Sequence, residues 1–160
     1  MKKYSVALFL GAACFPAYAQ TITPEAAFGA REGIMDVTIS PDGKHVAYIP
    51  PAAGQGSLLY TVEIGSEAPP KLALSATGDP ERLSSCDWIS NTRLICQLWA
   101  SVKLDNVFTT MSRLAAVNAD GSNIKVVTKK DGSNALGKSL FGGSVIDLAT
   151  NEDGSILLRR

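Results

Sequence analysis

Apolar and polar residues alternate along most of the chain, in short segments that end at turn-forming residues. A period of two is typical of strands with one buried face. The first unit of the pattern predicts strands at 36–40, 45–49, 58–64 and 71–75. The turn Pro41-Asp42-Gly43 joins the first two, and its Asp-Gly pair predicts a type I′ hairpin.

The pattern then starts again. The second unit predicts strands at 84–89, 93–99, 109–118 and 123–128, with an insertion around 100–106. A third start predicts strands at 144–150 and 155–160, on either side of the turn Asn151-Glu152-Asp153-Gly154. Four short strands per unit, repeated in order, indicate an all-β fold.

An aspartate occupies the same place before the first turn of each unit. Asp36, Asp87 and Asp147 lie 51 and 60 residues apart. Four-stranded units that recur at roughly 40–50 residues are the signature of propeller blades. We therefore predict a partial β-propeller with two four-stranded blades plus the start of a third, at about 35–79, 83–129 and 144–160. An antiparallel sandwich is the alternative, because its strands are also short and regularly spaced.

The N-terminus predicts a cleaved secretory signal over residues 1–19. Lys2 and Lys3 form a basic start, residues 6–15 are apolar, and Ala17-Tyr18-Ala19 places small residues where signal peptidase reads. Residues 20–34 then form a helical lead-in, since Thr23-Pro24-Glu25 suits a helix start. We expect a periplasmic or secreted protein, and a lipoprotein anchored at Cys14 is the weaker alternative.

Two cysteines, Cys86 and Cys96, remain after the signal, in a compartment where disulfides form. A turn centred on Asn91 pairs Ile89 with Arg93 and sets Cys86 opposite Cys96. The sequence leaves open a disulfide and two buried free thiols. We expect no metal site and no cofactor, because two cysteines and one histidine are too few for the usual four zinc ligands.

Charge excludes one class of partner. The chain has 15 basic and 15 acidic residues and no long run of one sign, so we expect no nucleic-acid binding. No apolar run of eighteen residues follows the signal, so we expect no membrane span in the mature chain.

Several segments resemble one family: "TPEAAFGAREGIMDVTISPDG", "ISPDGKHVAY", "DWISNTRLI" and "AAVNADGSNIKVV". In this order they are similar to the N-terminal propeller of secreted bacterial serine peptidases of the prolyl oligopeptidase family. The resemblance implies a propeller that covers an α/β-hydrolase domain and admits only short peptides. A peptide substrate would then be bound only through that hydrolase domain.

The catalytic motif of that family is missing here. A nucleophile elbow reads G-x-S-x-G, whereas Gly142–Ile146 ends on isoleucine and Gly137–Phe141 ends on phenylalanine. The single histidine, His45, follows a surface turn, where we expect it to be solvated. We therefore carry over no catalytic residue and expect the chain to be inactive alone.

Two functions remain open. The chain is either the truncated N-terminal propeller part of a periplasmic serine peptidase, gating peptide access in the full-length enzyme, or a periplasmic propeller-type binding or scaffold module. The second class is similar to the propeller protein of the Tol system. The "WISN" turn and the helical lead-in favour the first.

Overall fold

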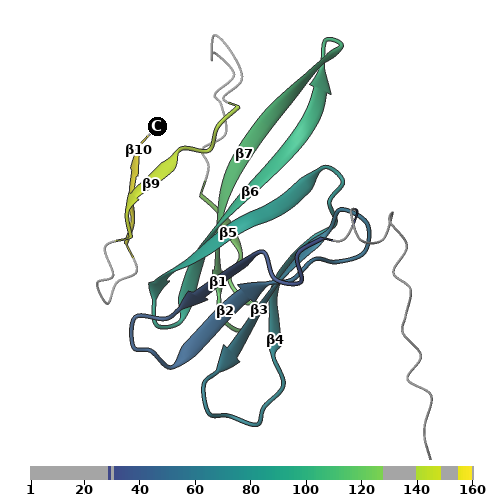
Figure 1. The fold of residues 1–160 in the computed structure, drawn as a ribbon. Helices are drawn as coiled ribbons and strands as arrows, with labels where there is room; N and C mark the ends of the chain where they lie inside the picture. Colours follow the sequence, from purple (N-terminus) through teal and green to yellow (C-terminus); the bar gives the residue numbers. More distant parts are fainter. Residues whose placement is uncertain (1–28, 30, 128–139, 149–154, 160) are drawn as a thin grey trace, which may run out of the picture. The chain divides into compact units, whose positions relative to one another are not determined.

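The computed structural model describes residues 29, 31–127, 140–148 and 155–159. The chain divides into two units, residues 1–30 and 31–160, and the second holds every strand (Figure 1). The predicted signal at 1–19 lies outside the described residues. So does most of the expected lead-in helix; of its described residues, Gly29 is helical and 31–34 are not.

The first sheet, sheet A, has four antiparallel strands in chain order. They are β1 (Asp36–Ile39), β2 (His45–Ile49), β3 (Ser57–Glu63) and β4 (Lys71–Ala76). All four lie within a residue or so of the predicted ranges, because each carries the alternating pattern with turn residues at both ends.

The second sheet, sheet B, repeats this order with three longer strands and a short fourth one. They are β5 (Glu81–Ser90), β6 (Arg93–Leu104), β7 (Val107–Asn118) and β8 (Lys125–Val126). Sheet C pairs β9 (Ser144–Asp147) with β10 (Leu157–Arg159). The ten elements of the described residues are thus all strands, which confirms the all-β class.

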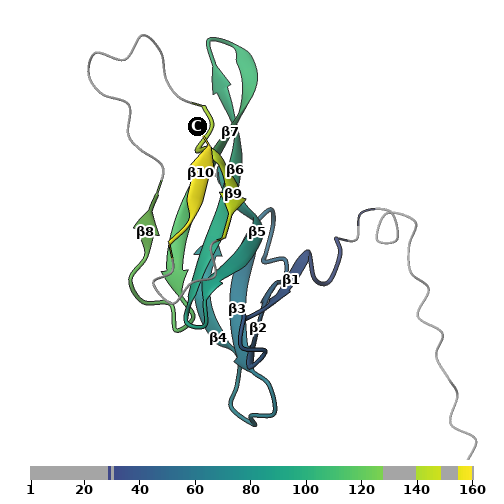
Figure 2. The ribbon, with the colours of Figure 1, turned by 90° about the vertical axis from the view of Figure 1, so that its left-hand side faces the viewer.

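The insertion expected at 100–106 is not a separate loop. Strands β6 and β7 continue through it as a hairpin in which Leu104 pairs with Val107. Asp105 and Asn106 make the two-residue turn with φ of 46° and 66°, the positive values of a type I′ turn. The tip extends beyond the neighbouring strands in both views (Figures 1 and 2).

The turn at Pro41-Asp42-Gly43 was predicted wrongly as type I′. Gly43 has φ of 69°, but Asp42 is not in the left-handed region. The hydrogen-bonded loop is longer than two residues, since the Ser40 N–H donates to the His45 carbonyl at 2.9 Å. The Asp42 carboxylate closes the turn instead, by accepting hydrogen bonds from the Ser40 hydroxyl (2.6 Å) and the Lys44 N–H (3.1 Å).

Two core clusters lie on opposite faces of sheet B. The first core cluster joins sheet A to sheet B, and its buried members are Ala47, Ile49, Leu59, Ala73, Ala76, Leu83, Cys86, Trp88, Leu94, Cys96 and Val117. The second core cluster joins sheet B to sheet C, and its buried members are Ile89, Ile95, Leu114 and Ala116. Consecutive residues such as Leu94 and Ile95 belong to different clusters because strand side chains alternate between faces. Sheet B is therefore covered on both sides.

Candidate functional site

The segment Gly142–Ile146, which resembles a nucleophile elbow in sequence, forms the start of a strand and not a catalytic turn. Gly142 and Gly143 lead directly into β9, which Ser144 opens as an exposed residue. A nucleophile elbow needs a sharp turn from a strand into a helix, and Ser144 stands at the start of a strand instead. The other near-match, at 137–141, lies mostly outside the described residues.

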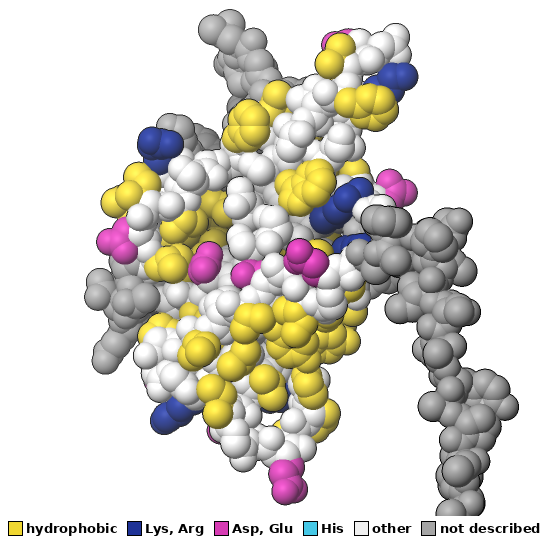
Figure 3. Space-filling view, in the orientation of Figure 1, with side chains coloured by type: hydrophobic (Ala, Val, Ile, Leu, Met, Phe, Trp, Pro, Cys, Tyr) yellow, Lys and Arg dark blue, Asp and Glu magenta, His cyan; other side chains and the backbone are white. Residues whose placement is uncertain are grey.

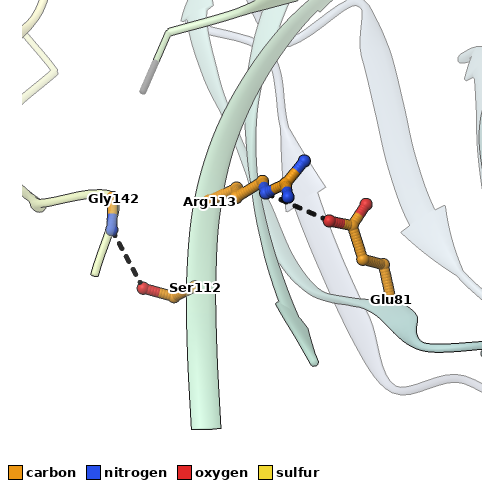
Figure 4. Close-up of polar contacts among 4 residues, drawn as sticks. All are labelled: Glu81, Ser112, Arg113 and Gly142. Carbon is orange, nitrogen blue, oxygen red and sulfur yellow. Dashed lines mark hydrogen bonds and ion pairs between the residues drawn. The ribbon is translucent and has the colours of Figure 1, made fainter. Parts of the chain in front are cut away.

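Strand β7 holds this segment against sheet B (Figure 4). The Gly142 N–H donates to the Ser112 hydroxyl at 3.3 Å, and the Ser112 N–H donates to the Leu140 carbonyl at 2.8 Å. The next residue, Arg113, points to the other side, where its Nε lies 3.2 Å from a Glu81 carboxylate oxygen. These contacts position the chain before β9 and leave no group ready to attack a carbonyl.

His45 is not solvated as expected. Its ring lies 6.0 Å from the Trp88 ring at an interplanar angle of 38°, and its Nδ1 is buried with no hydrogen-bond partner among the described residues. A small hollow of about 140 Å³ adjoins it, also lined by Thr61, Lys71 and Asp120. Sequence reasoning missed this burial because Trp88 comes from the second unit of the repeat.

The hollow beside His45 does not assemble a nucleophile with a base. Thr61 is its one alcohol among the lining residues, and that hydroxyl donates its proton to the Ala119 carbonyl at 2.6 Å. A catalytic alcohol donates instead to the base that will remove its proton. The hollow is also smaller than the several hundred cubic ångströms typical of ligand pockets.

Cys86 and Cys96 form a disulfide inside the first core cluster. They face each other across β5 and β6, with Cα atoms 4.1 Å and sulfurs 2.12 Å apart. The pairing of Cys86 with Cys96 and of Trp88 with Leu94 agrees with the predicted register. The expected pair of Ile89 with Arg93 is wrong, because Arg93 pairs with Ser90 and a bulge accommodates Ile89.

The aligned aspartates hold equivalent positions in the three sheets. Asp36 pairs with Ile49, Asp87 with Ile95, and Asp147 with Leu157, so each faces an aliphatic residue on the next strand. The repeat seen in the sequence is therefore also a repeat of strand register.

The first of these aspartates joins two sheets. The Asp36 carboxylate accepts a 2.9 Å hydrogen bond from the Cys86 N–H of sheet B. Further bonds run between the same two sheets, from the Leu83 N–H to the Ser57 hydroxyl at 2.8 Å and from the Asp42 N–H to the Asn91 side-chain oxygen at 3.1 Å. Asp36 thus provides a hydrogen-bond acceptor for a backbone N–H at the interface between sheets A and B.

Asp87 occupies the position in sheet B that is equivalent to Asp36 in sheet A. It lines a hollow of about 230 Å³ with Gln97, Gly143 and Ser144, between sheet B and the segment that starts sheet C. Burial, followed by the negative charge of Asp36, raises the pKa of Asp87 above that of an ordinary aspartate. A single carboxyl beside an amide and a hydroxyl lacks the second acid or base that hydrolysis needs.

Three further findings bear on function. Within the described residues no group of three or more His, Cys, Asp or Glu side chains could hold a metal ion. No described helix is long and apolar enough to cross a membrane. No family model matches the chain, and no curated protein or solved structure gives a significant match.

Proposed function

We propose that residues 35–160 are successive blades of a β-propeller from a secreted peptidase of the prolyl oligopeptidase family. In this proposal the blades restrict access to a catalytic domain whose residues lie outside these 160 positions. The chain therefore gates short peptides and performs no catalysis of its own.

The repeated packing of the three sheets is the observation that carries the proposal. Trp88 and Leu94 of sheet B pack on sheet A, in the first core cluster. Leu148 and Ile156, the residues at the equivalent places of the third unit, pack on sheet B beside the second core cluster. Each sheet thus uses the same positions to contact the sheet before it, as the blades of a propeller do. A two-layer sandwich has one interface between its sheets, whereas sheet B has an interface on each face.

The hydrogen bonds of the first interface support the same interpretation. Asp36, Ser57 and Thr38 of sheet A each bind the polypeptide of sheet B, the last through its carbonyl to the Trp88 indole N–H at 3.4 Å. Buried and half-buried polar groups with partners in the next sheet favour one fixed stacking over a loose apolar contact.

Activity measurements test the non-catalytic role. The purified chain is incubated with a fluorophosphonate probe and with chromogenic proline-containing peptides, beside an active serine peptidase as the positive control. We expect no labelling and no hydrolysis, because no activated nucleophile is assembled among the described residues. A labelled serine would overturn the proposed role.

The gene tests the family assignment independently. We expect the reading frame of the full protein to encode a G-x-S-x-G elbow followed by an aspartate and a histidine, the order found in α/β-hydrolases. A full-length frame without these residues would contradict the peptidase assignment and favour the binding or scaffold module.

A further inference from the structure

Sheets A and B meet through two hydrogen bonds whose acceptors have equivalent positions in the next unit of the repeat. The Asp36 carboxylate accepts the Cys86 N–H at 2.9 Å, and the Ser57 hydroxyl accepts the Leu83 N–H at 2.8 Å. Both donors belong to β5, the first strand of sheet B. The first strand of one sheet is thus bonded directly to the sheet before it.

The interface between sheets B and C differs at both acceptor positions. Asp87 is equivalent to Asp36, because each pairs with an isoleucine of the next strand. Two residues further along that strand, the cross-strand neighbour is Ser57 in sheet A and Leu114 in sheet B. Leucine has no hydroxyl to accept a hydrogen bond. The Asp87 carboxylate has no hydrogen-bond or ion-pair partner among the described residues.

A hollow of about 230 Å³ lies at this part of the second interface. Its lining combines polar with apolar side chains, among them Ser85, Asp87, Gln97, Ser144, Ile95 and Leu114. One water molecule takes about 30 Å³ of the liquid, so the hollow has room for a ligand of about seven non-hydrogen atoms. The Asp87 side chain remains accessible to solvent, so such a ligand can reach it.

The charge of the hollow favours a cation. Among the lining residues Asp87 alone carries a charge. Burial, followed by the negative charge of Asp36, raises the pKa of Asp87, and a nearby positive charge would favour the ionised carboxylate. Figure 3 shows acidic side chains in a row across the middle of one face of the molecule. Neighbouring charges of one sign raise the local concentration of ions of the other sign.

We propose that the hollow beside Asp87 binds a small primary ammonium ion with a short alkyl chain. An ammonium group has three N–H donors, and the lining offers acceptor oxygens on Asp87, Gln97 and Ser144. The alkyl chain lies against the apolar part of the lining, at Ile95 and Leu114. A divalent metal ion suits the hollow less well, because such ions take several oxygen ligands and the hollow has one carboxylate. This binding site goes beyond the proposed function and does not depend on it.

Nuclear magnetic resonance of the ¹⁵N-labelled chain tests the site. n-Butylammonium chloride is titrated at pH 7 and constant ionic strength. We expect saturable shifts of the N–H signals of Asp87, Gly143 and Ser144, with a Kd of about 1–10 mM, since so small a ligand gains little affinity. n-Butanol has the same chain without the charge and should give no saturable shift. A wild-type chain without saturable shifts would mean that the hollow holds water only, and would overturn the proposal.

Asp87→Asn removes the charge and keeps the shape of the side chain. It should weaken n-butylammonium binding about 10-fold or more, because a hydrogen bond to a charged group is lost. Asp105→Asn is the matched control: it removes an acidic charge at the β6–β7 turn, outside the hollow, and asparagine tolerates the positive φ of 46° found there. This control should bind like the wild type. Equal affinity of the Asp87→Asn variant and the wild type would contradict the site, and circular dichroism checks that both variants are folded.

The pKa of Asp87 gives a second measurement. A bound ammonium favours the charged carboxylate, so saturating n-butylammonium should lower the pKa of Asp87, followed through its carboxyl ¹³C signal. An unchanged pKa would show that the ligand does not contact this carboxylate. None of these outcomes bears on the nucleophile probe or the reading frame, so the proposed function can fail or stand separately.

Discussion

At the scale of single residues, a few polar side chains join sheet A to sheet B. Ser57 is fully buried, and its hydroxyl is the partner of the Leu83 N–H. Asp36 does the same for the N–H of Cys86. A buried N–H that loses its partner keeps the cost of leaving water without the gain of a bond. These side chains therefore matter more to stability than their small size suggests.

Ser57→Ala should destabilise the fold. The change leaves the Leu83 N–H buried without an acceptor, and we expect the free energy of unfolding to fall by about 1–3 kcal/mol. Chemical denaturation followed by circular dichroism measures it. Ser75→Ala on the neighbouring strand, where the side chain is exposed, is the control and should change stability by less than about 0.5 kcal/mol. Equal effects of the two changes would contradict the role of the Ser57 hydroxyl.

Asp87→Asn should stabilise the protein at pH 7. The pKa of Asp87 is raised by burial and by the charge of Asp36, so the folded state binds a proton that the unfolded state has already lost. Stability therefore falls as the pH rises from the ordinary aspartate range through this raised pKa. We expect the asparagine variant to lose that part of the pH dependence and to melt higher at neutral pH.

Asp120→Asn should have the opposite effect on stability at pH 7. Hydrogen bonds from the Ser122 hydroxyl and N–H lower the pKa of Asp120, so its charged form stabilises the turn above the ordinary aspartate range and that stability is lost as the pH falls. This variant should melt lower at pH 7. Thermal melts of both variants between pH 3 and 7 make the comparison, and shifts of the same sign at neutral pH would contradict the assignment.

At the scale of elements, the strand register determines which side chains of each repeat unit face which neighbouring sheet. The bulge at Ile89 lets Trp88 and Leu94 face sheet A while Ile89 and Ile95 face sheet C. The disulfide lies in the same hairpin and ties β5 to β6 at the centre of the first core cluster. This hairpin therefore supports both of its neighbours.

Replacing both cysteines of the β5–β6 hairpin by alanine should lower the free energy of unfolding by about 2–4 kcal/mol, because the cross-link restricts the unfolded chain. Both sulfurs are fully buried, so a reducing agent should cleave the bond only as the protein unfolds. Peptide mapping of oxidised, alkylated protein should recover Cys86 joined to Cys96. Recovery of both as alkylated thiols would refute the bridge.

At the scale of the whole molecule, the three sheets stack so that only the two end faces are bare within the described residues. Sheet B is covered on both sides, whereas Val37 and Ile39 of sheet A and Ile146 and Leu157 of sheet C are exposed. The same stacking supports the blade proposal. His45 lines one hollow, and Asp87 and Ser144 line another, so the described histidine and these two residues do not share a pocket.

The N-terminus gives a prediction about export. We expect the mature chain to begin at Gln20, because Ala17-Tyr18-Ala19 follows the apolar segment. The intact mass of protein recovered from the periplasm measures this directly. Retention of Met1, or a lipid on Cys14, would contradict the cleavage site.

The sequence by itself determined the local elements of this protein. Alternation located β1 to β7, and the spacing of Asp36, Asp87 and Asp147 gave a repeat whose strand register is equivalent in all three sheets. Local pattern suffices there, because a strand's period and its turn residues are read within a few positions. The predicted opposition of Cys86 and Cys96 is also correct, although the structure reaches it with a shorter turn and a bulge at Ile89 that the sequence did not predict.

The tertiary structure decided what distant residues do to one another. The contact of half-buried His45 with Trp88, the bond from Cys86 to Asp36 and the raised pKa of Asp87 join positions that lie 43 to 51 residues apart. Turn geometry was also decided there: Asp42 uses its side chain to close a loop and to meet Asn91. Such contacts depend on how one sheet packs on the next, and neither alternation nor spacing records which faces meet.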